Sequence, residues 1–271
     1  MSDLNSLGRY FYACAAVGSG IQQLVRADFV RVVPKLPVWV PAQPFLACAV
    51  GGVLIVAGAA ILSGYQSRRA ALALAALLVA TFVFQRVPEI IANPSVGYIW
   101  TNPSKVLAFL GGAILLSVWA PGAPPRRHWT GRLRPWSAGL LAVFLIICGY
   151  QHFAYADFVD TLVPAWFTHP RFWTCFTGSC LLAGGVGIMI PATARWAAIM
   201  AGVMVFLWVL VLHLPRAVTM SREPGETSAI FEALAISGVA FLVAGGRSGG
   251  RADRGHANSP AVDALDQREA V

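Results

Sequence analysis

Apolar residues occur in eight long runs, separated by short polar segments rich in Pro, Gly and Arg. With a flanking turn included, each run approaches the ~20 residues that a helix needs to cross a ~30 Å hydrocarbon core. The pattern predicts eight transmembrane helices, at residues 10–25, 45–62, 70–84, 106–120, 137–153, 172–190, 196–214 and 229–244. We therefore expect an all-α, polytopic membrane protein.

The second half of the chain repeats landmarks of the first half. The segment that starts at Gly20 (GIQQ) resembles the one that starts at Gly149 (GYQH), and both continue to an Ala-Asp-Phe-Val motif. Further along, Trp39 and Trp166 lie 127 positions apart, and later landmarks keep that offset. Such a period is longer than the 20 to 50 residues of solenoid repeats. The offset predicts a tandem duplication of one domain-sized unit.

Each predicted unit has four helices. Because that number is even, both copies must run in the same direction and be related by an axis along the membrane normal, so the fold is two parallel four-helix bundle repeats. The predicted organisation is a first repeat at 8–120, a cytoplasmic linker at 121–135, a second repeat at 136–245 and a disordered cytoplasmic tail at 246–271.

Composition and charge narrow the class of protein. Hydrophobic residues make up 57% of the chain and charged residues only 12%, about half the roughly 25% of a soluble domain, so the expected partner is the lipid bilayer. The net charge of +8 does not indicate nucleic acid, because Lys and Arg are scattered in short loops without forming one basic face. Lys and Arg are more frequent on the side of the termini and linker, which predicts a bacterial inner-membrane protein with both termini in the cytoplasm.

Several short motifs occur in a characteristic order in the second half. They are a Gly-x-x-His-Phe at Gly149, a Val-Pro-x-Trp turn at Val163, an Arg-Trp-Ala at Arg195 and a His-Leu-Pro at His213. In this order and spacing, residues 137–245 resemble the DoxX-like family of four-helix bacterial membrane proteins, and residues 10–120 resemble it through the repeat. Members of that family are associated with quinone-linked oxidation of sulfur compounds or with redox stress, so the resemblance implies an envelope redox setting.

Two histidines are predicted to reach the same depth in the membrane. His152 follows Trp136 by 16 residues, about 24 Å along a helix, and His213 follows Arg195 by 18 residues, about 27 Å. Placing an ionisable side chain within the membrane costs free energy, so such a residue is taken as a candidate for a functional site. We expect the two imidazoles to meet in one outer-leaflet cavity beneath the turn at 163–167, together with Gln151.

Three interpretations of this pair remain open. The imidazoles are neutral and hydrogen-bonded in the headgroup zone, or they bind a quinone or other small redox ligand, or they bind a metal with Glu232 or Asp157. We predict no metal site, because the spacing matches no metal motif. The candidate ligand-binding residues of the second repeat are Gln151, His152, Asp157, His213 and Glu232, and their counterparts in the first repeat are Gln22, Gln23, Asp28, Arg86 and Lys105.

The counterparts set further expectations. The first repeat has Gln23 and Arg86 where the second has histidines, so imidazole chemistry is confined to the second repeat. The two Asp residues are read as turn caps or as partners of nearby cations. Lys105 and Glu232 occupy the same repeat position with opposite charge, and a contact between them is expected if the repeats abut.

The sequence contains no nucleotide-binding loop, Cys/His cluster or haem attachment motif. We therefore expect an accessory or structural component of an envelope redox or stress system, with partner proteins of a redox complex, and not an autonomous enzyme. The alternatives are a quinone-linked oxidoreductase subunit and a small-solute transporter. No cofactor is assigned, and a quinone is the candidate ligand.

Overall fold

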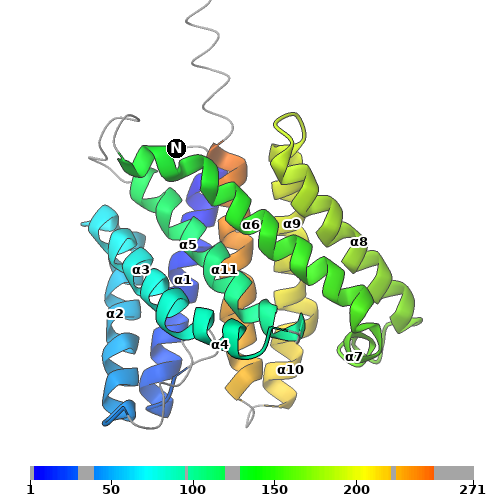
Figure 1. The fold of residues 1–271 in the computed structure, drawn as a ribbon, viewed down its shortest axis with the longest axis horizontal. Coiled ribbons are helices and arrows are strands. Elements are labelled where there is room, and N and C mark those ends of the chain that lie inside the picture. Colours follow the sequence, from blue (N-terminus) through cyan, green and yellow to red (C-terminus); the bar gives the residue numbers. More distant parts are fainter. Residues whose placement is uncertain (1–2, 30–39, 95–96, 120–128, 221–223, 247–271) are drawn as a thin grey trace, which may run out of the picture.

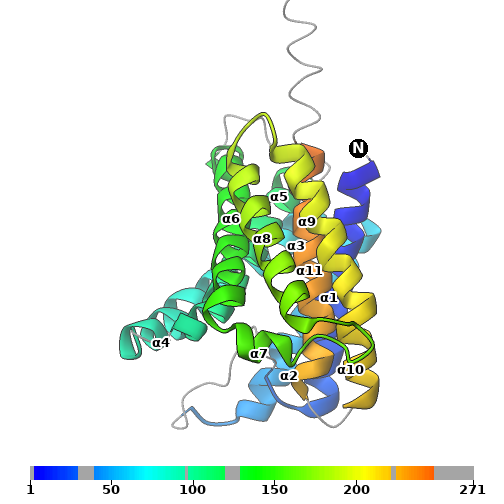
Figure 2. The same ribbon diagram turned by 90° about the vertical axis from the view of Figure 1, so that its right-hand side faces the viewer.

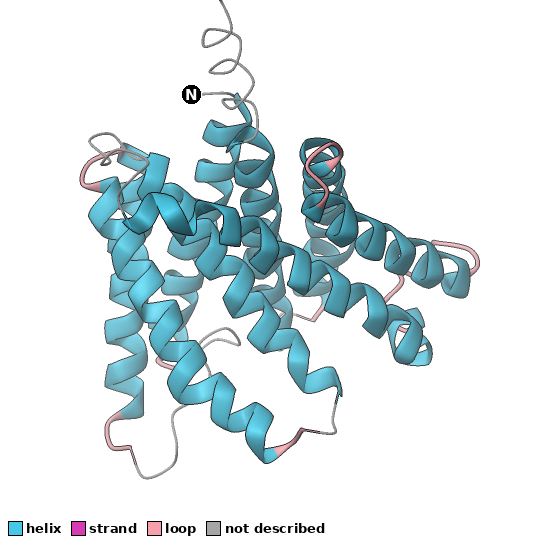
Figure 3. Cartoon of the chain, turned by 45° about the horizontal axis from the view of Figure 1, so that its top comes forward, coloured by secondary structure: helices cyan, strands magenta, loops and turns pink. Residues whose placement is uncertain are grey.

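The structure, a computed structural model, describes residues 3–29, 40–94, 97–119, 129–220 and 224–246. All regular secondary structure in these ranges is helical (Figure 3). The predicted tail and most of the predicted linker lie outside the described residues. The all-α prediction is confirmed for the part of the chain that the structure describes.

The two halves share the order of their four long helices, with a π turn and a short helix after the third, and they differ in the other short helices. The first half comprises α1 (Asp3–Arg26), α2 (Gln43–Ser63), α3 (Ser67–Thr81), η1 (Phe82–Arg86), α4 (Val87–Ala92), η2 (Gly97–Trp100) and α5 (Thr101–Trp119). The second half comprises α6 (Trp129–Ala154), α7 (Ala156–Asp160), α8 (Pro170–Met189), α9 (Ala194–Trp208), η3 (Val209–His213), α10 (Leu214–Thr219) and α11 (Pro224–Gly246). All eight predicted spans fall on these helices.

Seven helical segments of the described residues are long and apolar enough to cross a membrane. They are Gln43–Ser63, Ser67–Ala92, Gly97–Trp119, Pro135–Ala154, Pro170–Met189, Ala194–Thr219 and Gly225–Gly246. The multi-pass membrane prediction is therefore confirmed. The first predicted span lies in α1, which is a helix of 24 residues but is not among the seven; it carries several polar residues, including the buried Gln22 and Gln23. That α1 is an eighth span stays a prediction.

The long helices form a closed ring of neighbours. In the first half α1 packs on α2, α2 on α3 and α3 on α5, and in the second half α6 packs on α8, α8 on α9 and α9 on α11. The halves meet where α5 packs on α6, where α11 packs on α1 and where α11 packs on α5 (Figures 1 and 2). The start of α1 and the end of α11 lie at the same end of the assembly (Figure 1).

Helix α11 is the centre of the assembly. It contacts α1, α5 and α9, and 72% of its apolar window is buried inside the protein, against 28% for α2 at the periphery. Peripheral helices leave large apolar side chains such as Phe45, Val56 and Phe84 exposed. Exposed apolar residues on this scale fit a bilayer as the surrounding medium.

Glycines allow the closest helix contacts, and they do so at matching places in the two halves. A Cβ at Gly20 would lie 2.5 Å from the carbonyl oxygen of Gly51, and one at Gly149 would lie 2.9 Å from that of Gly178. Only a missing side chain lets backbones approach this closely, as is common between membrane helices. Gly51 and Gly178 are therefore helix-contact residues.

Both third helices contain a π-helical turn, η1 and η3, whose last residue is two positions before a proline. Proline has no N–H and cannot donate to the carbonyl one turn earlier, and a π turn accommodates the lost bond. Arg86 ends η1 and His213 ends η3. The turn thus places these two sequence-predicted residues at one geometrically distinct position in each half.

Candidate functional site

The second half contains a cavity of about 260 Å³. Its walls come from the end of α6, the first turns of α8, the junction of α9 and η3, and the segment that follows α7. Helix α7 lies at the same end of the molecule as α10 (Figure 2). The lining residues are His152, Val159, Leu162, Val163, Pro164, Phe167, Trp173, Thr174, Thr177, Trp208, Val211, Leu212 and His213. The surface is mainly apolar and aromatic, with a few polar groups.

His152 is fixed in the cavity wall by two contacts. Its Nδ1 lies 2.7 Å from the carbonyl oxygen of Cys148, one turn earlier on α6. A carbonyl oxygen only accepts, so Nδ1 carries the proton and donates it, and in the neutral ring Nε2 is left as an acceptor. The imidazole also stacks on the indole of Trp208, with ring centroids 6.2 Å apart. The helix backbone therefore selects one tautomer of this histidine.

His213 reaches the same cavity from the other side of the bundle. It is the last residue of η3, directly before the Leu214-Pro215 step, and it is half-buried. The structure thus brings the two histidines of helices α6 and η3 to one cavity under the segment that contains Val163, Pro164 and Phe167.

Thr174 is a polar cavity residue that sequence reasoning missed. It lies on the first turns of α8, is 1% exposed, and its hydroxyl oxygen has no hydrogen-bond partner among the residues that the structure describes. The neighbouring Thr177 differs, because its hydroxyl donates to the Trp173 carbonyl at 2.8 Å. The sequence signal was weak: Thr174 replaces Ala47 of the first half within an otherwise apolar helix.

Gln151 does not line this cavity. Its amide nitrogen donates to the Gly97 carbonyl at 2.8 Å, and its amide oxygen accepts from the Thr101 hydroxyl at 2.7 Å. Gln22 has the matching contact in the first half, where its amide oxygen accepts from the Ser228 hydroxyl at 3.1 Å. These two glutamines connect the halves, across the α5–α6 contact and the α1–α11 contact.

The two aspartates lie away from the cavity lining. Asp157 is 96% exposed and forms an ion pair with Arg171, which also pairs with Asp160 at 3.1 Å. Asp28 accepts the backbone N–H of Phe29 at 2.8 Å. Both contacts agree with the interpretation of these residues as turn or ion-pair groups.

Lys105 and Glu232 form an ion pair between the halves. The Lys105 Nζ donates to Glu232 Oε2 at 2.6 Å, and their side chains are 18% and 6% exposed. The two residues lie on α5 and α11, and neither lines the histidine cavity. The expected contact is therefore present, and it is buried.

In the first half, Gln23 and Arg86 are buried at the positions of the two histidines. Gln23 is 0% exposed, and its amide nitrogen lies 3.5 Å from the Ala47 carbonyl, a long hydrogen bond. Arg86 is 2% exposed and pairs with Glu89 at 2.7 Å. Arginine keeps its charge, so a carboxylate beside it offsets the cost of burial.

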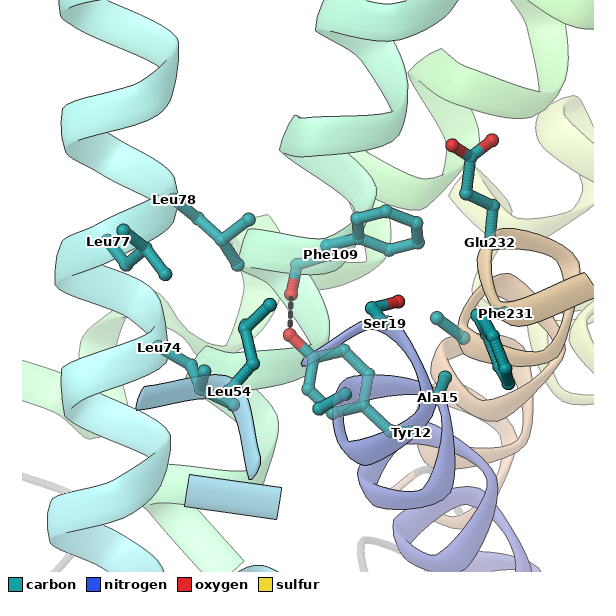
Figure 4. A pocket seen from close by; sticks show the side chains of 12 residues that line it. Tyr12, Ala15, Ser19, Leu54, Leu74, Leu77, Leu78, Phe109, Phe231 and Glu232 are labelled. Atoms are coloured by element: carbon teal, nitrogen blue, oxygen red, sulfur yellow. Dashed lines mark hydrogen bonds between the residues drawn. The ribbon is translucent and has the colours of Figure 1, made fainter. Parts of the chain in front are cut away.

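A smaller cavity of about 60 Å³ lies between helices of the first half and α11 of the second half (Figure 4). Its walls are leucines of α2 and α3 with Phe109 and Phe231, and Glu232 stands at its edge. Tyr12 contributes a ring and donates its hydroxyl to the Phe109 carbonyl at 2.8 Å. That hydroxyl is already paired, so the polar groups that this cavity offers are those of Ser19 and Glu232, whose Oε1 has no hydrogen-bond partner among the described residues.

The described residues contain no group of three or more His, Cys, Asp or Glu side chains that could hold a metal ion. The five cysteines, which lie on α1, α2, α6 and α8, are free thiols. The histidine cavity is therefore best described as a site that offers hydrogen bonds and aromatic surface.

Comparison with known families gives two matches. Residues 4–86 match the DoxX family model, and residues 141–245 match the model of a domain of unknown function, DUF8561. The DoxX match confirms the predicted resemblance for residues 4–86, whereas the motifs that carry this resemblance in the sequence lie mainly in residues 137–245. Residues 4–86 contain no histidine, so the match does not depend on imidazole. No curated protein and no solved structure matches the chain.

Proposed function

Since residues 4–86 form a DoxX domain in a multi-pass membrane protein, we propose that the chain is an accessory component of an envelope redox or stress system, and that its second half binds a small membrane-soluble ligand. The proposal rests on one observation. His152, His213 and Thr174 face one apolar cavity of about 260 Å³. A cavity with apolar walls and a few convergent polar groups is the usual form of a small-molecule site.

The comparison of the two halves supports a ligand role over a purely structural one. If the residues at these two positions served only to hold the helices together, we would expect both halves to fill them with groups that find partners within the protein. Yet the first half fills them with Gln23 and with Arg86, which is paired to Glu89, whereas the second half combines two imidazoles with an unpaired threonine hydroxyl. An unpaired buried hydroxyl is unfavourable unless a ligand or water satisfies it.

The cavity is better suited to binding than to chemistry. Among the described residues its lining contains no Asp, Glu, Lys, Arg or Cys side chain, so these residues offer no carboxylate base and no thiol nucleophile, and the two imidazoles are their groups for proton transfer. This favours the accessory role. A quinone-linked oxidoreductase subunit is the second candidate, because imidazoles and a hydroxyl can hold the oxygens of a quinone ring.

We place the protein in a bacterial inner membrane with both termini in the cytoplasm. The excess of Lys and Arg at the termini and linker supports this orientation under the positive-inside rule. The shared end of α1 and α11 in Figure 1 fits an even number of crossings. The two halves are proposed to be tandem copies that pair around an axis along the membrane normal.

The test compares a double variant, His152→Ala with His213→Ala, with a matched control, His169→Asn. His169 is exposed, does not line the cavity and has φ 57°, a left-handed conformation that Asn tolerates. Both proteins are purified from the native membrane, and the bound lipids and quinones are extracted and identified. We expect a small molecule with the wild type and the control and none with the double variant. An unchanged extract and an unchanged cellular phenotype would assign the histidines a structural role.

A further inference from the structure

We propose that the ligand of the histidine cavity belongs to the phenol class: a neutral, membrane-soluble ring that donates a hydrogen bond through a hydroxyl group. This inference rests on the proposed function of the cavity and specifies which ligand the cavity selects. It follows from the shape of the cavity, from the absence of charge in its lining and from the direction of its hydrogen bonds.

The shape favours one aromatic ring. Phe167, Trp173 and Trp208 supply aromatic surface, and aliphatic residues close the remaining walls. A cavity of about 150 Å³ is enough to bind benzene. The 260 Å³ available here therefore accommodates a single ring with small substituents. Aromatic walls stabilise a ring by offset and edge contacts.

The lining favours a neutral ligand. Its described residues include no Asp, Glu, Lys or Arg, and an ion transferred from water into such surroundings would lose its hydration without gaining a counter-ion from them. A carboxylate or an ammonium group is therefore excluded as the part of the ligand that enters. A hydroxyl enters at a lower cost when it finds hydrogen-bond partners.

The direction of the hydrogen bonds selects a donor. The Cys148 carbonyl holds the proton of His152 on Nδ1, at 2.7 Å, so Nε2 is the ring nitrogen that remains for a ligand, and it accepts. Thr174 adds a hydroxyl that has no partner within the described part of the chain and can both donate and accept. A phenol hydroxyl donates to His152 and accepts from Thr174. A ring with only carbonyl or ether oxygens leaves His152 without a donor.

Thr174 gives the inference a specific variant. Thr174→Val removes the hydroxyl at nearly constant volume, and the free protein loses only an unpaired buried group. We expect its thermal stability to stay the same or to rise, while its affinity for a phenol falls. Thr177→Val is the matched control on the same helix, because the Thr177 hydroxyl is already bonded to the Trp173 carbonyl. His152→Phe tests the acceptor and keeps an aromatic ring against Trp208.

The experiment uses the full-length protein in detergent and two isomers of identical composition, 4-propylphenol and 4-ethylanisole, which differ in the presence of a hydroxyl donor. Binding is measured by titration calorimetry against protein-free micelles. We expect the wild type and Thr177→Val to bind the phenol about tenfold more tightly than the ether, a ratio that one well-placed hydrogen bond supports. His152→Phe and Thr174→Val should each reduce that ratio severalfold.

The outcomes separate the two proposals. If both isomers bind with equal affinity, or if both cavity variants keep the wild-type ratio, donor selection is wrong while ligand binding stands. Equal binding of a carbonyl-only ring, 2-methyl-1,4-benzoquinone, would likewise overturn donor selection in favour of the quinone alternative. If no ring binds to the wild type above the micelle background, the proposed ligand-binding function fails as well.

Discussion

Lys105 and Glu232 pair at 2.6 Å although they are 127 positions apart, the same offset that relates Trp39 to Trp166. Equivalent residues of two copies can touch each other only at the axis that relates the copies. Two identical copies would place like charges together there, whereas this chain places a lysine against a glutamate. The pair therefore supports the proposal that the halves are tandem copies, and it marks where their axis would pass.

Other contacts between the halves follow the same correspondence. Gln22 pairs with Ser228 and Gln151 with Thr101, which are equivalent contacts under the two repeat offsets. A Cβ at Gly8 would lie 2.6 Å from the Gly238 carbonyl oxygen, and one at Gly111 would lie 2.8 Å from the Ser137 carbonyl oxygen. The two contact regions between the halves are thus built alike.

Breaking the Lys105–Glu232 pair should destabilise the protein. Lys105→Met leaves a carboxylate buried without its counter-ion, and we expect a loss of about 2–3 kcal/mol, seen as a lower unfolding temperature in detergent. The exchanged variant, Lys105→Glu with Glu232→Lys, should recover most of that loss, because it restores opposite charges in place. An unfolding temperature for Lys105→Met equal to the wild-type value would show that the pair contributes nothing to the joining of the halves.

Two adjacent glycines on α2 should respond differently to alanine. A Cβ at Gly51 would lie 2.9 Å from the Gly20 carbonyl oxygen, whereas one at Gly52 would have no neighbour within 4 Å. Gly51→Ala should therefore force α1 and α2 apart and lower the unfolding temperature. Gly52→Ala should be neutral or stabilising by up to ~1 kcal/mol, since alanine is the better helix former. Equal effects at both positions would contradict the close contact.

Gly178 links helix packing to the cavity. A Cβ there would lie 2.7 Å from the Cβ of His152, so Gly178→Ala should displace the histidine and weaken ligand binding. Gly139→Ala on α6 is the control, because its added Cβ would meet nothing within 4 Å. The measurement is the calorimetric affinity for 4-propylphenol. If the two variants bind it alike, the position of His152 does not set the affinity.

Asp157→Asn should change neither ligand affinity nor unfolding temperature measurably. Its carboxylate is 96% exposed, and ion pairs in water are screened and weak. This outcome separates Asp157 from the cavity residues, although the sequence suggested both as candidates. A marked loss of ligand binding in this variant would return Asp157 to the site.

Topology can be measured with reporter fusions. Fusions after Arg69, Arg195 and the last residue should report the cytoplasm, and those after Asn93 and Met220 should report the opposite side. An odd number of crossings, or a C-terminus outside, would contradict the parallel arrangement.

The sequence by itself determined the helices and their medium. Long apolar runs with few charges are stable as helices inside a bilayer, so the positions of seven spans, the all-α class and the resemblance to the DoxX family could be predicted from pattern and motif order. It also indicated the equal depth of His152 and His213, because depth follows from the constant rise of a helix.

Only the tertiary structure decided which neighbours each polar residue meets. Gln151 and His152 are adjacent in sequence and lie on different faces of α6, so one connects the halves and the other lines the cavity. The role of Thr174 depends on its hydroxyl having no hydrogen-bond partner among the described residues, and the order of residues in the sequence does not reveal whether a side chain has a partner. The neighbours of a side chain depend on how its helix is rotated about its own axis. Packing fixes that rotation, and the hydrophobicity of the sequence does not.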